Sequence, residues 1–382
     1  MKTALRTSFL FAALLSLGCK QGAALFGENL AGKYKTKLEA GLAAFDAGQF
    51  HEAQADLTAA LQTAEKMGDD GRAAIALQNL TSLSLRQGKN AEAKERAAKA
   101  AEHLAKGPSD DAFLVAAVNL QLGKAATFTA DFPTAFASID KAVAGFEKAN
   151  DAKNEIFDAL LTRGMALQAA GKHGDAQAAF KKAIDFERNR RKIGDETAEL
   201  AAAYCEMGRD SVEAGELDVA NQHFDRATKI LRSIRMLNKE EPAASKPIES
   251  WVAVNVAWLM HEKKQPVKLG SVYTDALKNF DKLGRPGRET AFLHREYGRL
   301  LMEEKKFPQS EVELKRSLEL CHSFYSENHP ELAKTLYIYA ELLDATSRAE
   351  EATDCRNKAK AILAAVEKPK AFETVKQQAN AK

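Results

Sequence analysis

The chain has 382 residues, of which 45% are hydrophobic and 28% are charged, a composition typical of a globular protein with enough apolar side chains for a large core. It contains only 9 prolines, and its long stretches of Ala, Leu, Glu and Lys predict helix nearly throughout. The formal net charge of +2 argues against nucleic acid as a partner, because nucleic-acid-binding proteins present a clustered positive surface.

Residues 1–18 have the pattern of a secretory signal peptide. Lys2 and Arg6 supply the basic start, and residues 8–17 form an apolar run that is too short to cross a bilayer as a helix. Without these two basic residues, 53 basic and 53 acidic residues remain, so the exported body carries no net charge. Two other interpretations stay open: cleavage by an ordinary signal peptidase after residues 22–24, and a buried N-terminal helix.

A small residue and a cysteine, Gly18 and Cys19, directly follow the apolar run. This pair resembles the cleavage site of a bacterial lipoprotein signal, in which the cysteine is diacylated and becomes the new N-terminus. The resemblance implies that Cys19 is lipid-modified, and more than one acyl chain on one residue anchors a protein stably to a membrane. Lys20 rather than aspartate follows, which implies the outer membrane or its periplasmic side, and residues 19–33 would then form a tether.

The rest of the chain repeats a small residue at steps of about 42 residues, and such a period is typical of helical repeat proteins. The repeated positions are Ala53, Ala93, Ala135, Ala176, Ala220, Leu269, Ser310 and Ala352. Twelve residues before each of them stands a second small residue, in the series Gly41, Thr81, Gly123, Gly164, Gly208, Ala257, Gly298 and Ala340. Four residues after most of them stands a larger side chain, as at Leu57, Ile139, Phe180, Phe224, Tyr273 and Leu314. Two helices can cross closely only where their side chains are small, so each repeat predicts a packed helix pair.

A turn signal lies five residues before each repeated position. Four units carry glycine there, at Gly48, Gly88, Gly171 and Gly215, and the other four carry Ala130, Lys264, Lys305 and Ser347. A helix C-terminus favours a residue with left-handed backbone geometry at this point, and glycine adopts it most readily. The two helices of each unit are therefore predicted to meet at a short turn.

These patterns resemble the tetratricopeptide repeat over residues 34–364, and the long step resembles the kinesin-light-chain-like subclass. Residues 328–336 and 340–343 match that subclass best. The resemblance implies an all-α, right-handed superhelix of about eight helix–turn–helix units, with units 1–5 in 34–236 and units 6–8 in 248–364. The subclass often carries paired asparagines before the small residue of the first helix, whereas only Asn79 and Asn255 stand at the inner of those positions here.

Two segments interrupt or end the array. Residues 237–247 contain two prolines in a polar run, which cannot continue a helix and predicts an exposed loop. This loop is either a hinge between units 5 and 6 or a harmless insertion. Residues 365–382 form a polar tail in which Ala371–Ala379 is predicted to cap the open end of the array.

The sequence shows no catalytic or metal-binding motif, and it predicts no cofactor. No two of the eight histidines stand four residues apart, and His261 lacks the second histidine of a zinc-binding helix. Besides Cys19, the cysteines are Cys205, Cys321 and Cys355, and their places along the predicted helices favour three free thiols.

The first helices of tetratricopeptide repeats line a concave face on which peptides lie, and the resemblance carries these positions onto this chain. In units 1–2 they are Leu38, Leu42, Phe45, Gln78 and Ser82, and in units 6–8 they are Trp251, Val254, Trp258, Phe292, Arg295, Arg299, Lys334 and Tyr337. The second set combines aromatic rings with arginines, the usual composition of a binding hot spot. The alternative is that the two tryptophans pack between helices and that the arginines pair with Glu296 and Glu303.

The leading hypothesis is therefore a non-enzymatic interaction scaffold in the cell envelope, which binds an extended peptide or a partner helix in its groove. A second hypothesis is a sensor or regulator whose superhelix flexes when a ligand binds. A third is an enzyme, which would require several titratable groups to converge on one pocket.

Overall fold

The computed structural model describes residues 29–106, 111–149, 152–190, 196–237, 246–265, 269–282 and 287–367. All regular secondary structure within these ranges is α-helix. The predicted signal peptide, Cys19, residues 20–28 and the predicted capping helix at Ala371–Ala379 lie outside the described residues. So does most of the predicted 237–247 loop, residues 238–245.

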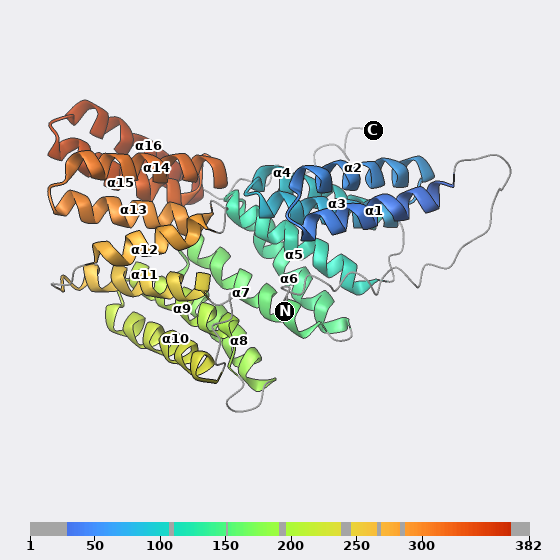
Figure 1. Cartoon of the computed structure of the whole chain (residues 1–382), viewed down its shortest axis with the longest axis horizontal. Helices are drawn as coiled ribbons and strands as arrows, with labels where there is room; N and C mark the ends of the chain where they lie inside the picture. Colours follow the sequence, from blue (N-terminus) through green and yellow to red (C-terminus); the bar gives the residue numbers. More distant parts are fainter. Residues whose placement is uncertain are drawn as a thin grey trace, which may run out of the picture.

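Sixteen described helices form eight consecutive pairs, which confirms the predicted α-solenoid (Figure 1). The first helices of the pairs are α1 (Leu30–Asp46), α3 (Asp70–Arg86), α5 (Ala112–Phe128), α7 (Lys153–Ala169), α9 (Ala198–Glu213), α11 (Lys246–Glu262), α13 (Arg288–Glu303) and α15 (Pro330–Ala345). The second helices are α2 (Phe50–Met67), α4 (Asn90–Ala105), α6 (Phe132–Lys148), α8 (His173–Asn189), α10 (Leu217–Leu237), α12 (Gly270–Asp281), α14 (Phe307–Phe324) and α16 (Ala349–Glu367). Helix α1 thus begins inside the segment predicted as a tether.

The small residues of the repeat are the contact points within each pair. Ala53 and Ala220 are completely buried, and a Cβ atom built on Gly208 would lie only 2.6 Å from Cε1 of Phe224, sixteen residues further on. Ser310 replaces alanine in the seventh unit without leaving a buried hydroxyl unpaired, because its Oγ donates a hydrogen bond of 2.7 Å to the carbonyl of Gly298. The sixth unit differs, because Leu269 takes the repeated position there and directly precedes the short helix α12.

The turn between the helices of a pair has the left-handed geometry that the sequence predicts. Gly48, Gly88, Gly171 and Gly215 have positive φ, and so do the four residues that stand at the same place in the other units, Ala130, Lys264, Lys305 and Ser347. These are the only non-glycine residues with positive φ among the described residues. The turn therefore imposes its backbone geometry even where no glycine is present.

Replacing Ala130 with glycine is expected to raise the free energy of unfolding by about 1 kcal/mol, because the left-handed conformation costs an L-residue with a Cβ atom roughly that amount. The opposite change at the equivalent turn, Gly215→Ala, is expected to lower it by a similar amount. Urea denaturation of the two variants measures both effects. If both substitutions changed the free energy of unfolding in the same direction, the left-handed turn geometry would not be what determines the stability of the helix pair.

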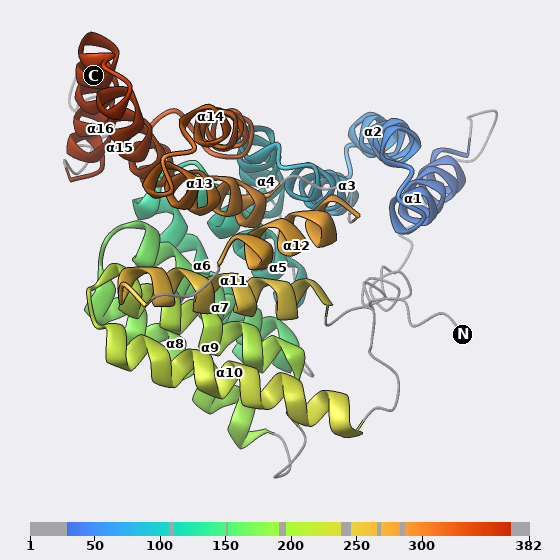
Figure 2. The ribbon, with the colours of Figure 1, turned by 60° about the vertical axis from the view of Figure 1, so that its left-hand side comes forward.

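The first helices lie on the inner side of the curved array. Each contacts the first helix of the following pair from α1 through α15, whereas second helices contact mainly first helices. The array curves so far that its last pairs return toward its early ones, as the views in Figures 1 and 2 show for α14 and the α3–α4 region. Two hydrogen bonds join the early and the late helices. Asn90 Nδ2 donates to the carbonyl of Phe324 at 2.5 Å, and the amide of Ser326 donates to the carbonyl of Phe128 at 3.3 Å.

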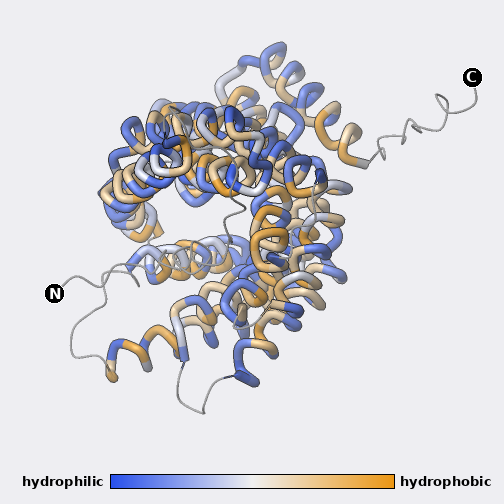
Figure 3. Tube along the Cα trace, turned by 90° about the vertical axis from the view of Figure 1, so that its right-hand side faces the viewer, coloured by the Kyte–Doolittle hydropathy of each residue, from blue (hydrophilic) through white to orange (hydrophobic). Residues whose placement is uncertain are grey.

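Hydrophobic and hydrophilic residues alternate along each helix in Figure 3, as expected where one face of a helix is buried and the other meets water. The largest apolar cluster extends from α5 through α13 and includes Phe146, Phe224, Trp251 and Tyr273. In the part of the chain that the structure describes, no helix combines the length and the apolar character needed to cross a membrane.

Candidate functional site

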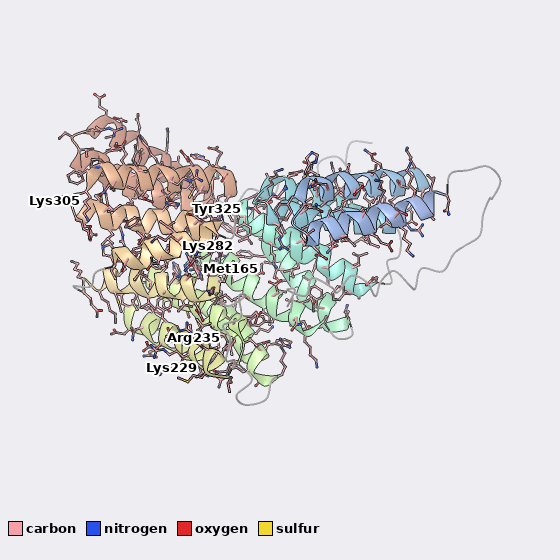
Figure 4. All side chains as sticks on the ribbon, viewed as in Figure 1. Met165, Lys229, Arg235, Lys282, Lys305 and Tyr325 are labelled. Carbon is pink, nitrogen blue, oxygen red and sulfur yellow. The ribbon has the colours of Figure 1, made fainter. Side chains whose placement is uncertain are left out.

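A small central pocket lies where the inner helices of units 3–8 converge. Its volume is about 40 Å³, enough for a few water molecules. Its walls come from α5, α7, α9, α11, α13, α15 and the α14–α15 turn, and the lining residues are Thr127, Phe128, Met165, Gln168, Ala169, Arg209, Glu213, Trp251, Arg288, Tyr325, His329 and Glu331. Figure 4 labels two of these residues, Met165 on α7 and Tyr325 just after α14, which line the same pocket although they are far apart in the sequence. Every lining residue thus belongs to a first helix or to the turn before one.

Glu206 on α9 accepts hydrogen bonds from three residues that line this pocket. Arg288 donates to both carboxylate oxygens, at 2.7 and 3.2 Å, and Arg209 donates to Oε2 at 3.1 Å. The indole nitrogen of Trp251 donates to Oε1 at 2.9 Å. Burial opposes ionisation of Glu206, but the two guanidinium groups outweigh it and lower the pKa of this carboxyl to about 2.

A second set of ion pairs joins α9, α13 and α15. Glu331 accepts from Arg295 at 2.7 Å and from Lys334 at 2.7 Å, and Lys334 also lies 2.9 Å from Glu213. Burial opposes the charge on Glu331, but Lys334 and Arg295 hold the pKa of its carboxyl well below the usual range. Paired charges from units 5, 7 and 8 therefore form one network on the inner face.

Aromatic rings fill the space between these ion pairs. Phe292 packs edge-on against Trp251 and Trp258, with ring centroids 5.3 and 5.2 Å apart. The guanidinium of Arg209 lies 4.9 Å from the Trp251 ring and 5.0 Å from the Phe292 ring. Such contacts between arginine and aromatic rings strengthen when water is excluded, so they fix the arginine in place.

The protonation states of the pocket suit binding better than acid–base catalysis. A general acid or base works best with a pKa near the working pH. Here the pKa of Glu206 is about 2, and burial lowers the pKa of His329 to about 4. Glu206 and Glu331 therefore stay charged and His329 stays neutral near pH 7. The described residues contain no group of three or more side chains suited to a metal ion.

The structure brings part of the predicted groove together and separates the rest. Trp251, Trp258, Phe292 and Arg295 form one contiguous buried cluster, and Arg299 and Lys334 lie at its edge with partly exposed side chains. Val254 is fully buried in the same apolar cluster as the two tryptophans. The remaining predicted residues lie elsewhere: Tyr337 beside the core of the last pair, and Leu38, Leu42, Phe45 and Gln78 in units 1–2. Their role in binding a partner stays a prediction.

The arginines of unit 7 have partners on three helices. Arg295 donates to Glu296 at 2.9 Å besides Glu331, and Arg299 pairs with Glu262 at 2.7 Å and with Glu296 at 3.0 Å. Glu303, the other predicted partner, pairs with His261 at 2.6 Å. The arginines thus take part in the fold, and charge reversal at Arg295 would test stability as much as binding.

Several residues of the pocket were not predicted, although the repeat contains a signal for them. Arg209 stands one residue after the small residue Gly208, the same register as Trp258 and Arg299 in their units. Gln168 stands four residues after Gly164, the register that Phe45 occupies in the first unit. Applying the same positions to units 4 and 5 would have found both. Tyr325 lies in a turn that the repeat pattern does not describe. His329 lies in residues 328–336, which resemble the repeat subclass, but the resemblance implies no binding role for it.

The two inner asparagines and the cysteines have structural roles. Asn79 and Asn255 each donate to the carbonyl four residues earlier on their own helix, at 2.8 and 2.7 Å. Cys205, Cys321 and Cys355 are free thiols, as expected. Burial raises the pKa of Cys321 to about 11, which makes its thiolate form scarce near pH 7.

His329 makes stability depend on pH. Its Nδ1 accepts a hydrogen bond of 3.2 Å from the amide of Glu331, its ring stacks on Tyr325 at 4.0 Å, and it faces the Thr127 carbonyl and the charges of Glu331 and Lys334. Because the pKa is about 4 in the folded chain and about 6.5 in an unfolded chain, the unfolded chain binds more protons between these values. The free energy of unfolding is therefore expected to fall as the pH drops from 6.5 to 4.

His329→Asn is expected to remove this component, since an asparagine retains the cap of α15 without titrating. Urea denaturation across pH 4–7 should give a flatter profile for the variant than for the unmodified chain. Parallel profiles would show that His329 titrates in the folded chain much as it does in the unfolded one.

The architecture is that of a tetratricopeptide-type α-solenoid with a charged and aromatic inner face. No protein-family model matches the chain, and no curated protein matches it either. Among solved structures it is similar to the Rap conjugation gene regulator of the plasmid pLS20 in complex with the Phr* peptide, with a TM-score of 0.59 and 14% sequence identity over 88% of this chain and 95% of the other. It is also similar to a Rap protein complexed with competence and sporulation factor, with a TM-score of 0.58 and 13% identity over 89% of this chain and 99% of that one. At these identities the likeness shows a shared fold.

Proposed function

We propose that the chain is a non-enzymatic interaction scaffold that holds an extended peptide segment of a partner against its inner face. The observation that carries this proposal is the central pocket, which six first helices build together and which combines aromatic rings, arginines and carboxylates. Interfaces concentrate binding energy at such buried aromatic and arginine residues. The two Rap structures, described as complexes with a Phr* peptide and with competence and sporulation factor, support the proposal by sharing the fold.

A random-peptide display library tests this function directly. The chain is expected to enrich peptides over several rounds, and the enriched peptides should lose binding to Met165→Arg, which places a long charged side chain at the pocket lining. Met165 is half-buried and lies on an inner helix. We expect at least a tenfold loss of affinity, about 1.4 kcal/mol.

Met236→Arg is the matched control, because Met236 is 83% exposed near the end of the second helix α10. Both variants should keep the helical circular dichroism of the unmodified chain. Failure to enrich any peptide, or equal binding to both variants, would contradict the proposed function.

A second candidate function, a regulator that changes shape on binding, is favoured by the closure between distant repeats. Phe324 packs edge-on against Phe128 at 4.9 Å, and its carbonyl accepts the hydrogen bond from Asn90. A peptide that enters the pocket next to Tyr325 would compete with this turn. Solution X-ray scattering with and without an enriched peptide should then show a changed radius of gyration. An unchanged scattering envelope would contradict the change of shape and would favour a rigid scaffold.

We also propose that the scaffold is exported and anchored in the cell envelope through Cys19. The signal-like residues 1–18 and the Gly18–Cys19 pair support this proposal. Mass spectrometry of the N-terminal peptide from native membranes is expected to show a diacylated Cys19. An unmodified N-terminus after residues 22–24 would instead indicate simple secretion.

A further inference from the structure

The central pocket contains hydrogen-bond donors that the folded chain leaves without partners. Arg209 Nε and Gln168 Nε2 are both buried without a hydrogen bond, and both residues line the pocket. Arg209 is 6% exposed and Gln168 is 7% exposed. Unpaired donors so deeply buried are rare and destabilising, and they call for an acceptor in the pocket that both residues line.

The pocket also offers acceptors. The carboxylates of Glu213 and Glu331 line the same pocket as Arg209 and Gln168, and each carboxylate can accept more hydrogen bonds than those it receives from Lys334 and Arg295. The missing group therefore meets both donors and acceptors. A group that can accept from Arg209 and Gln168 and also donate to a carboxylate satisfies both sides.

Charge decides between an anionic and a neutral group. Two arginines, Arg209 and Arg288, and two glutamates, Glu213 and Glu331, line the pocket, so its lining carries no surplus positive charge. Arg288 is already engaged by both oxygens of Glu206. A carboxylate placed here would stand beside two other carboxylates in a site shielded from water, which is unfavourable. A neutral polar group has no such cost.

We propose that this pocket is a subsite for the carboxamide side chain of an asparagine or glutamine in the bound peptide, an inference that rests on the proposed function. The carboxamide oxygen accepts from Arg209 Nε and Gln168 Nε2, and its NH₂ group donates to Glu213 or Glu331. Its three heavy atoms occupy about the space of the few water molecules that the volume of 40 Å³ admits. Phe128, Met165 and Tyr325 surround the aliphatic stem.

The first test examines the residues that the display library enriches. The unmodified chain is expected to select peptides with asparagine or glutamine at one fixed position, and changing that residue to norleucine should weaken binding at least tenfold. Gln168→Met removes a donor at nearly constant volume, so it should still capture peptides but lose the carboxamide preference. Gln54→Met is the matched control, because Gln54 is half-buried on second helix α2, outside the predicted groove, and does not line the pocket.

Enriched peptides that carry aspartate or glutamate at the fixed position, or no preferred residue, would overturn the subsite while leaving the scaffold function intact. No enrichment at all would contradict the scaffold function. The two failures are therefore distinguishable.

The second test does not require a captured peptide. The chain has two tryptophans, so ¹⁵N-labelled tryptophan gives two indole signals, and Trp258→Phe assigns that of Trp251. Titration with N-acetylglutamine amide is expected to shift the Trp251 signal saturably, and N-acetylglutamate amide and N-acetylnorleucine amide should leave it unchanged. Gln168→Met should weaken the glutamine-amide response about tenfold, and an absent or non-selective response would mean that the pocket holds only water.

Discussion

Glu206→Gln is expected to lower the free energy of unfolding by about 3–5 kcal/mol, because it removes the charge that Arg209 and Arg288 share inside the protein. Glu206 is 2% exposed, so water cannot replace the lost carboxylate. Urea denaturation followed by tryptophan fluorescence measures this effect locally, since both tryptophans lie in α11 and Trp251 donates to Glu206.

Glu95→Gln is the matched control. Glu95 forms an ion pair of 2.7 Å with Lys99, but both side chains are largely exposed, and such pairs contribute little to stability. A loss below about 1 kcal/mol for Glu206→Gln, or equal losses for both variants, would show that the buried network is not essential to the fold.

The effect of Glu206→Gln should also depend on pH. The pKa of Glu206 is about 2 in the folded chain and about 4.3 for a glutamate in an unfolded chain, so its stabilisation is complete above the higher value and declines as the pH falls toward 2. The difference in stability between the unmodified chain and the variant is therefore expected to shrink below pH 4.

Gly208→Val is expected to lower the free energy of unfolding by about 3 kcal/mol, the upper range for overpacking a core. Even a Cβ atom at this position would approach Cε1 and Cδ1 of Phe224 to 2.6 and 2.7 Å, and valine adds two further carbons. The helices α9 and α10 would have to separate to admit them. The same urea measurement applies.

Gly174→Val provides the comparison, because a Cβ atom at Gly174 in α8 meets nothing within 4 Å. Its effect should stay within about 0.5 kcal/mol. A similar loss at both glycines would mean that glycine matters for helix propensity alone and that the close crossing of α9 and α10 is not required.

The fold could be predicted from the sequence because every repeat carries the same pattern of small and large packing residues. The small residue at 208, the alanine at 220 and the ring at 224 mark one helix crossing, and the turn residues predict the left-handed backbone even at Ala130 and Ser347. Such local rules need no knowledge of distant contacts. Eight helix pairs follow from them, with starts and ends shifted by a few residues.

The site was only partly predictable because curvature brings distant units together. Trp251, Phe292 and Arg295 stand at register positions that the sequence identifies, and they do cluster. The turn from Tyr325 to His329 meets α5 only because the array closes on itself, through contacts about two hundred residues apart in the chain such as that of Ser326 with Phe128. No repeat pattern encodes that closure, so the composition of the pocket becomes visible only in three dimensions.

Photo-crosslinking shows directly whether a peptide partner binds along the inner helices. An enriched peptide that carries a photoreactive residue is linked to the chain, and the linked residues are mapped by mass spectrometry. We expect crosslinks in the first helices α5, α7, α9 and α11 and in the α14–α15 turn, which line the pocket. Crosslinks confined to second helices such as α8 or α10 would contradict binding along the inner helices.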